Sequence, residues 1–388
     1  MENAAFRKTS AQDTRFQPTT HTDAMHRAWS AKMADSVMRR CPTVVNPRSY
    51  ESGLLFKSIA QVWQDTNDEK YYAYIKENVD SILGPGGMIT AYLMEEYNLD
   101  NINIGKIFLF LYNQCGHEKY KQAAHHLRRQ LYTHPRVSQG GFWHKQIYPH
   151  QMWLDGIYMA SPFYAEFAKL FDEPEGFDDV ANQIFLIDEH ARDPKTGLRY
   201  HAWDASKNQR WANPDTGCSP HFWGRAMGWY AMALVDILEY FPATHPKRPR
   251  ILDILEDVAD AVSSVQDGNS GLWYQILDQG DRDGNYWEAS ASCMFVYALA
   301  RGVNEGYLDR RYLEVAQKGH AGIIEHLIDV DEQELVSLNG ICSVAGLGGA
   351  PYRDGSFEYY IGEKVVSNED KGIGAFILAS VEMERMKA

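Results

Sequence analysis

The sequence predicts an all-α protein built from helical hairpins, and three observations lead to this prediction. Apolar residues recur at the i, i+3 and i+4 spacing of amphipathic helices along most of the chain. Runs with the two-residue period of a strand are few and short. A glycine followed by an apolar or aromatic residue also recurs, usually before a polar link and a further helix. Hairpins arranged in series in this way can close into a ring.

The expected helices follow one another in chain order. The clearest apolar patterns are ESGLLFKSIAQVWQ (51–64), DEKYYAYIKENVDSIL (68–83), GKIFLFLYNQC (105–115), AMGWYAMALVDILEYF (226–241), ILDILEDVADAVSSV (251–265) and MFVYALARGV (294–303). The glycine repeats read GGMITAY, GGFWHKQ, TGLRYHAW and SGLWYQIL. The helices that open after these links, or close the chain, read DNINIGKIF, MWLDGIYMA, WGRAMGWYA, WEASASCMF and NEDKGIGAFILA.

The starts of these helices are predicted to gather at one end of the ring. The first turn of a helix carries free N–H groups and the positive end of the helix dipole. Polar side chains near the starts are Asp100, Asp155, Arg225, Glu288 and Asp370. The spacing therefore predicts a polar cluster at the mouth of a funnel.

The chain is expected to hold one domain behind a short arm. Residues 1–28 are polar and are predicted to form a mobile N-terminal arm. No Pro- or Ser-rich linker divides residues 29–388, although a chain of 388 residues could hold two or three domains. We therefore expect residues 29–388 to form a single catalytic domain.

The composition excludes several classes of partner. A net charge of −14 argues against nucleic acid and anionic membrane surfaces. The N-terminus has no apolar signal core, and apolar runs such as IFLFLY are far too short to span a bilayer. The five cysteines are scattered, odd in number and form no CxxC or Cys/His cluster. We expect a cytoplasmic protein with reduced thiols and no metal ion or other cofactor.

Asp155 is the first candidate for chemistry, because it stands among aromatic and apolar residues that include Trp153 and Ile157. A bare carboxylate away from water is costly unless it is paired, hydrogen-bonded or neutralised. One interpretation is a first-turn acid satisfied by backbone N–H groups. The other is a general acid/base whose pKa is raised by its surroundings. Asp100 is a second candidate, with the same two interpretations.

Cationic and aromatic side chains accompany these acids. His144, Lys145 and His201 supply donors, although lone histidines are more often structural than catalytic. Arg225 stands between Trp223 and Trp229, which favours a stacked or carboxylate-binding role. Tryptophans usually fill a core, but a flat apolar face beside polar donors is also what a sugar ring needs.

Three segments resemble a known family. They are GFWHKQIYPHQMWLDGIYMASPFYAEF, HFWGRAMGWYAMAL and AGLGGAPYRDGSFEYYIGEKVVSNEDKGIGAFILA, and they resemble the unsaturated rhamnogalacturonyl hydrolases of glycoside hydrolase family 105. The resemblance runs from about residue 30 to the C-terminus. It implies an (α/α)6 barrel with the active site at one end of the funnel. It also implies a small oligosaccharide substrate that begins with a 4,5-unsaturated galacturonic acid, usually linked to rhamnose.

The resemblance also implies site residues. The catalytic aspartate falls on Asp155 and the second important aspartate on Asp100. The positions expected to contact substrate are His144, Lys145, Trp153, His201, Trp223, Arg225, Trp229, Ala345, Gly346 and, as the nearest N-terminal candidate, Tyr50. The chemistry implied is protonation of the C4=C5 vinyl ether at C4, followed by addition of water at C5. It requires an acid that stays protonated near neutral pH, whereas a free carboxyl titrates near 4. Burial against Trp153 is expected to raise the pKa of Asp155.

Other functions stay open at the level of the sequence. An unsaturated glucuronyl hydrolase would use the same chemistry on glycosaminoglycan, ulvan or arabinogalactan fragments. An ordinary glycosidase would use Asp100 and Asp155 as a carboxylate pair. A sugar epimerase would use paired histidines, and a non-catalytic sugar-binding protein would need Arg225 and the aromatics but not Asp155. The chain is expected to act as a monomer or a homodimer.

Overall fold

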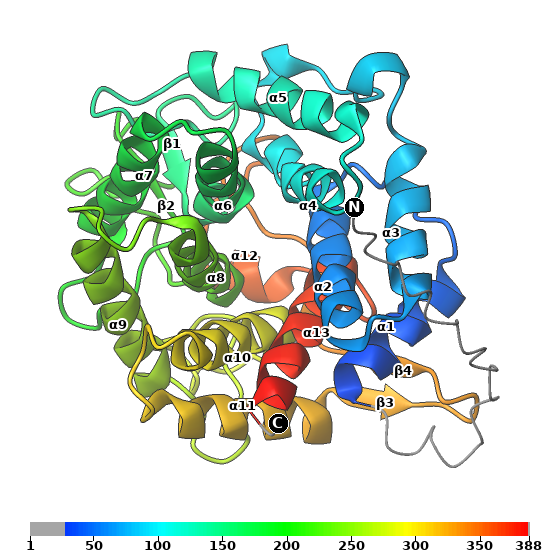
Figure 1. Ribbon diagram of the computed structural model, residues 1–388. Helices are drawn as coiled ribbons and strands as arrows, with labels where there is room; N and C mark the ends of the chain where they lie inside the picture. The colour runs from blue at the N-terminus through cyan, green and yellow to red at the C-terminus, as the bar shows by residue number, and fades with distance from the viewer. Residues whose placement is uncertain (1–27, 387–388) are drawn as a thin grey trace, which may run out of the picture.

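Helices at the centre of the molecule form a closed inner ring (Figure 1). The computed structural model describes residues 28–386. The inner helices are α2 (Tyr50–Thr66), α4 (Gly105–Cys115), α6 (Leu154–Leu170), α8 (Gly224–Tyr240), α10 (Ala289–Asn304) and α13 (Asp370–Arg385). Each packs against the next in this order, and α13 packs against α2, which closes the ring.

A second ring of helices surrounds the first (Figure 1). Its members are α1 (Trp29–Arg40), α3 (Glu69–Asp80), α5 (Glu118–Thr133), α7 (Glu175–Ala191), α9 (Arg248–Ser264) and α11 (Tyr312–His326). Helices α3, α5, α7, α9 and α11 each pack behind the inner helix that precedes them, and α1 packs against α13. The first and last helices therefore make the sixth pair, and the predicted (α/α)6 barrel is confirmed.

Small residues allow the inner helices to approach one another closely. A Cβ atom at Gly374 of α13 would lie 2.8 Å from the Cγ of Leu54 on α2. A Cβ atom at Gly105 of α4 would lie 2.5 Å from the ring of Phe163 on α6. Real side chains do not tolerate such distances in a close-packed interior, so glycine sets the spacing of the ring at these contacts.

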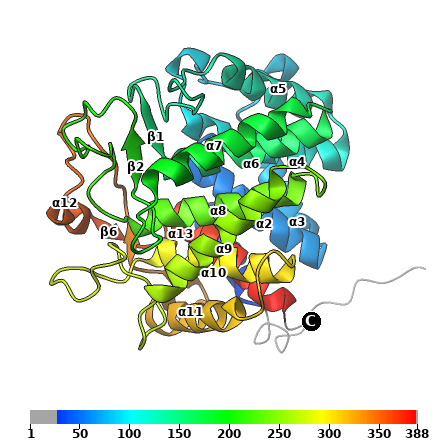
Figure 2. The ribbon, with the colours of Figure 1, turned by 90° about the vertical axis from the view of Figure 1, so that its left-hand side faces the viewer.

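Long links between the helices collect at one end of the barrel (Figure 2). Strand β1 (Gln151–Trp153) pairs antiparallel with β2 (Ala202–Asp204), and β5 (Ile341–Cys342) pairs with β6 (Val365–Val366). The short helix α12 (Phe357–Gly362) lies at the same end (Figure 2). Strand β1 runs directly into α6, so the first turn of α6 opens at this end.

The remaining short elements complete the described chain. They are the 3-10 turns Pro85–Gly87, Met94–Glu96 and Leu99–Ile102, and the antiparallel pair β3 (Ile328–Val330) with β4 (Val336–Leu338). The five cysteines are free thiols. Within residues 28–386 no helix combines the length and apolar character needed to cross a membrane. The predicted N-terminal arm, apart from its last residue, lies outside the described residues, and the cytoplasmic location stays a prediction.

Candidate active site

Asp155 lies in the first turn of α6, at the end of the barrel where the links collect. The residue before the helix is Trp153, and no side chain caps the helix start. The Asp155 side chain is 14% exposed, and its Oδ2 atom is buried without a hydrogen-bond partner in the described chain. Backbone N–H groups therefore do not satisfy both oxygens, which argues against the purely structural interpretation of this acid.

His201 stands beside that carboxylate, with its Nε2 atom 3.4 Å from Asp155 Oδ2. The pairing of β1 with β2 sets this proximity, because Trp153 is opposite Ala202 and the Leu154 N–H donates to the His201 carbonyl. On the other side of the ring, His201 Nδ1 lies 2.8 Å from the hydroxyl of Tyr360, a buried residue of α12. The imidazole is therefore hydrogen-bonded through Nδ1, while Nε2 faces the carboxylate without a hydrogen bond in the described chain.

The pKa of the Asp155 carboxyl lies below its ordinary value, so the expectation that it is raised is wrong for the substrate-free protein. Burial raises this pKa, as expected. The proximity and charge of His201 and the charge of His144 lower it further than burial raises it. Asp370, in the first turn of α13, behaves in the opposite way, because burial and the charge of Glu51 raise its pKa to about 6.

Asp100 anchors a second group of polar side chains. It lies in the 3-10 turn before α4, with Oδ2 at 2.5 Å from Lys145 Nζ and Oδ1 at 3.5 Å from His144 Nε2. Burial lowers the pKa of Lys145, but the charge and hydrogen bond of Asp100 raise it more, so the ion pair persists at neutral pH. Burial lowers the pKa of His144 to about 4, so this histidine is neutral there. Its ring stacks on Trp153 at 4.6 Å.

Arg225 is a buried cation in the first turn of α8. Its guanidinium lies 4.8 Å from the Trp223 ring, and Nη1 donates to the carbonyl oxygen of Cys342 and to Ser290 Oγ. Burial would lower the pKa of Arg225, but neighbouring groups, including Cys342, Glu288 and Asp155, raise it. The site therefore contains one cation that stays charged at every working pH.

Glu288 is structural rather than available for chemistry. It caps α10 by accepting hydrogen bonds from the Ala291 N–H at 2.7 Å, from Ser290 Oγ and from the Cys342 N–H at 2.9 Å. Both carboxylate oxygens are occupied, which is how a fully buried acid is stabilised.

The predicted aromatic contacts divide into two groups. Trp153 and Trp223 pack around His201, at ring distances of 5.1 and 4.7 Å. Trp229 lies deeper, packed between Tyr50 and Tyr158, with 1% of its surface exposed. Trp229 thus packs below His201 and Asp155 as part of the core, and its contact with substrate stays a prediction. Tyr50 is half-buried at the start of α2.

Residues 345–353, which we call the tail loop, cover the site from the C-terminal side. Gly346 and Leu347 are buried, and Leu347 shares a small apolar cluster with Trp153. Arg353 donates through Nη2 to the Tyr148 hydroxyl, and the Tyr148 ring stacks on Trp153 at 4.9 Å. The structure thus brings the loop that contains Ala345 and Gly346 next to the other predicted residues.

Tyr360, Tyr148 and Arg353 were not predicted from the sequence. Each lies inside a segment that carried the family resemblance, but each gains its place through a contact far along the chain. No local pattern distinguishes Tyr360 from the tyrosine beside it. Pairing across 159 residues, as between His201 and Tyr360, has no signal in a single sequence.

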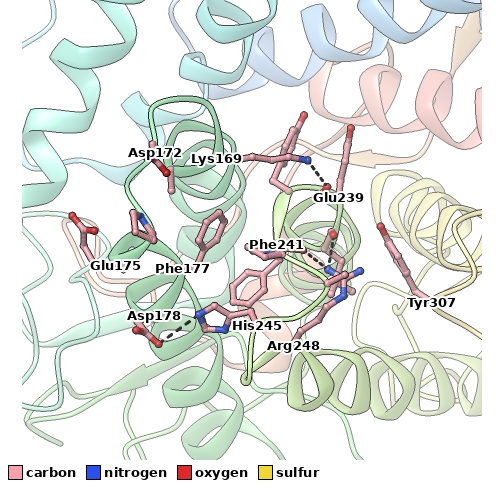
Figure 3. Close-up of a pocket in the computed structure, with 16 residues that line it drawn as sticks. Lys169, Asp172, Glu175, Phe177, Asp178, Glu239, Phe241, His245, Arg248 and Tyr307 are labelled. Atoms are coloured by element: carbon pink, nitrogen blue, oxygen red, sulfur yellow. Dashed lines mark hydrogen bonds and ion pairs between the residues drawn. The ribbon is translucent and has the colours of Figure 1, made fainter.

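A pocket that is separate from the candidate active site lies at the other end of the barrel, and Figure 3 shows the residues that line it. It has a volume of about 890 Å³ and is formed between the C-terminal ends of α6 and α8 and the N-terminal parts of α7 and α9. Its cations are engaged, since Arg248 donates to the Phe241 carbonyl and Lys247, nearby, pairs with Asp178. None of the predicted site residues lines it. Across the described residues, no cluster of three His, Cys, Asp or Glu side chains is arranged to hold a metal ion.

Comparison with known proteins gives consistent matches. The model of Glycosyl Hydrolase Family 88 matches residues 29–387. A solved glycoside hydrolase of family 105 from C. acetobutylicum ATCC 824 is 48% identical and superposes with a TM-score of 0.91, covering 92% of this chain and 100% of that chain.

Two curated relatives extend the comparison. Protein Atu3128 of Agrobacterium fabrum is 40% identical over 233 residues, which is 58% of this chain and 97% of that protein. The unsaturated rhamnogalacturonyl hydrolase YesR of Bacillus subtilis is 29% identical over 297 residues, covering 75% of this chain and 79% of YesR.

Proposed function

The chain belongs to Glycosyl Hydrolase Family 88, and from that premise we propose that it releases 4,5-unsaturated galacturonic acid from rhamnogalacturonan fragments. It is a glycoside hydrolase, and the resemblance to family 105 is confirmed by the close structural match. The proposed substrate is the unsaturated galacturonyl-rhamnose unit, the class named for the YesR relative. The observation that carries the proposal is the Asp155 carboxylate, which keeps one buried oxygen unpartnered beside His201.

Asp155 is the proposed proton donor to C4. It is ionised in the substrate-free protein because His201 and His144 lower its pKa. A bound uronate adds a like charge and displaces water, and both effects raise the pKa of a carboxyl. Substrate binding thus brings Asp155 to the state in which it carries a proton, while His201, 3.4 Å away, orients the carboxyl and stabilises its charged form.

The bond changes balance without a covalent enzyme intermediate. The proton forms a C4–H bond with the electrons of the C4=C5 double bond, and C5 becomes an oxocarbenium-like cation. Asp155, now ionised, accepts a proton from the water that adds to C5. The hemiketal opens to a ketone, and the hemiacetal left at C1 releases the remaining saccharide as an alcohol.

The other polar side chains have proposed roles that follow from their charges. Arg225 is the permanent cation and is suited to the uronate carboxylate or to charge that develops beside it. Asp100 holds Lys145 in an ion pair, and together they offer an acceptor and a donor to sugar hydroxyls. His144, neutral and stacked on Trp153, adds a nitrogen that is buried and unpartnered.

The experiment that tests this function follows the ultraviolet absorbance of the unsaturated uronate. The purified protein is incubated with rhamnogalacturonan digested by a lyase, and in parallel with unsaturated disaccharides from glycosaminoglycans. We expect the absorbance to fall with the rhamnogalacturonan product. A fall with the glycosaminoglycan disaccharides alone would assign the protein to unsaturated glucuronyl substrates, and no fall with either would reject the function.

A further inference from the structure

A pocket of about 600 Å³ lies beside the candidate active site. Tyr148 and Gln151, from the link before α6, line one part of it, and the tail loop lines another. Figure 2 shows β1, which follows this link, and α12, which follows the tail loop, at the same end of the barrel. The Tyr148 ring lies 4.9 Å from Trp153 and nearly parallel to it, at 14°. An aromatic path therefore connects the surroundings of Asp155 to this pocket.

Arg353 is the cation of the pocket, and it is held in one position. Its Nε donates to the Gly348 carbonyl at 2.9 Å, and its Nη2 donates to the Tyr148 hydroxyl at 2.8 Å. No carboxylate of the described residues lies within the 4.0 Å of an ion pair with this guanidinium. Glu363 lines the same pocket but does not pair with Arg353. Because Nη2 also donates to the Leu347 carbonyl at 3.2 Å, Nη1 is the nitrogen left to donate to a carboxylate from a ligand.

Gly346 makes room for this arginine. A Cβ atom at position 346 would lie 2.5 Å from Arg353 Nη1 and 2.9 Å from Cζ. The Gly346 N–H also donates to the Tyr359 hydroxyl, which orders the loop against α12. The glycine in AGLGG is thus required for space, because any side chain would push the guanidinium out of its place.

We propose that this pocket binds an acidic sugar of the leaving saccharide, with Arg353 receiving its carboxylate and the Tyr148 face packing against a sugar ring. The proposal rests on the proposed function. A rhamnogalacturonan backbone alternates galacturonic acid with rhamnose, so the third sugar from the unsaturated end carries a carboxylate. The pocket borders the candidate site, because Tyr148, whose hydroxyl accepts from Arg353, stacks on Trp153 beside His201 and Asp155. The protein then prefers fragments longer than a disaccharide.

Three substrates test the proposal on the unaltered protein. They are the unsaturated disaccharide, the unsaturated tetrasaccharide, and a tetrasaccharide with galactose in place of the internal galacturonic acid. We expect kcat/KM for the natural tetrasaccharide to exceed that for the disaccharide by about tenfold, and the galactose substitution to remove most of this advantage. Equal values for the two tetrasaccharides would overturn the proposal. Activity on the disaccharide shows that the proposed function holds in either case, whereas inactivity on all three rejects both.

A pair of variants tests the arginine itself. In Arg353→Gln, kcat/KM for the natural tetrasaccharide, divided by kcat/KM for the disaccharide, should fall. The ratio should approach the one that the unaltered protein shows for the galactose-containing tetrasaccharide against the disaccharide. Arg210→Gln is the matched control, because Arg210 is exposed and stacks on Tyr352 of the tail loop at 4.3 Å without lining the pocket. We expect the control to keep the wild-type ratio. A wild-type ratio in Arg353→Gln, or the same loss in both variants, would contradict the role of Arg353.

Discussion

Asp155 and Asp236 are both carboxylates of the inner ring, but they lie near opposite ends of their helices and have different partners. Asp236, near the end of α8, forms an ion pair with Lys57 and accepts a hydrogen bond from the Tyr297 hydroxyl at 2.6 Å. Both of its oxygens are engaged. Asp155, at the start of α6, has His201 at 3.4 Å and one oxygen without a hydrogen bond.

The pKa of both carboxyls is lowered, yet the causes differ. Burial raises the pKa of Asp236, and the charges of Lys57, Arg301 and Lys106 lower it further, so its ionised state is permanent. The groups that lower the pKa of Asp155 are the neighbouring His201 and His144. The comparison teaches that burial does not identify a catalytic acid. What distinguishes Asp155 from Asp236 is an oxygen left without a hydrogen bond, and this supports its proposed role.

The largest expected effect separates these two aspartates by exchanging each for its amide. Asp155→Asn should lose about 10² to 10⁴-fold in kcat, because the proton donor is gone, while the melting temperature changes little. Asp236→Asn should keep most of its kcat per folded molecule. It should lose unfolding free energy, by less than the roughly 3 to 5 kcal/mol of a fully buried pair, because the partly buried Lys57 loses its counter-ion. Near wild-type turnover in Asp155→Asn, or an inactive but fully stable Asp236→Asn, would break the comparison.

His201 is expected to act through Asp155, and the pH profile is the test. His201→Gln removes the largest neighbouring influence that lowers the pKa of Asp155, so that pKa should rise. The limb of the kcat/KM profile that reports Asp155 should then move to higher pH, and kcat should fall by about 10²-fold from lost orientation. A merely structural role would lower kcat and leave the limb where it is.

Arg225 is predicted to receive negative charge on the substrate. Arg225→Ala should raise KM, lower kcat, or both, for a combined loss of about 10 to 100-fold, typical of a lost charge-assisted hydrogen bond. Arg225→Lys should recover only part of the loss, because the two-pronged geometry of the guanidinium is missing. The measurement is kcat and KM of both variants. Wild-type values of kcat and KM in both would show that the uronate carboxylate binds elsewhere.

The last expected effect concerns stability in acid rather than activity. His144 has a folded pKa of about 4 and an unfolded value near 6.5, so it is neutral when folded and takes up a proton on unfolding. Stability should therefore decrease as the pH falls from about 6.5 to 4, by up to about 3 kcal/mol. Asp236 adds to this loss of stability only below about pH 4, where its carboxyl is protonated in the unfolded chain but still ionised in the folded one. Denaturant titrations should show a flatter pH dependence for His144→Asn, and identical slopes would contradict this assignment.

Much of the barrel could be predicted from the sequence, because its inner helices carry strong apolar periods and repeated helix starts. The outer helices α1, α5, α7 and α11 were not singled out. Helices α1 and α5 bury only one face and carry many polar residues on the other, so they contain fewer apolar residues than an inner helix despite a clear amphipathic period. The closure of the ring by α1 against α13 joins the two ends of the chain, which a local pattern does not contain.

The residues that the family resemblance named as site residues lie together in the structure, and their roles stay predictions; the direction of the Asp155 pKa shift was not predicted. The sequence placed Asp155 among aromatic residues, which favoured a raised pKa. The pKa of Asp155 is lowered instead, because His201 and His144 come from separate links and approach the carboxylate only in the folded chain. The tryptophans show the same limit, since spacing alone does not tell that Trp229 points into the core.

Isotope labelling of the product tests the central claim most directly, since that claim is hydration of the C4=C5 bond rather than displacement at C1. The unsaturated disaccharide is turned over in heavy water and in ¹⁸O-labelled water, with the saturated disaccharide as the matched control. We predict deuterium at C4, the oxygen label entering first at C5, and no cleavage of the saturated compound. Label entering first at C1, or cleavage of the saturated disaccharide, would show instead that Asp100 and Asp155 act as the carboxylate pair of an ordinary glycosidase.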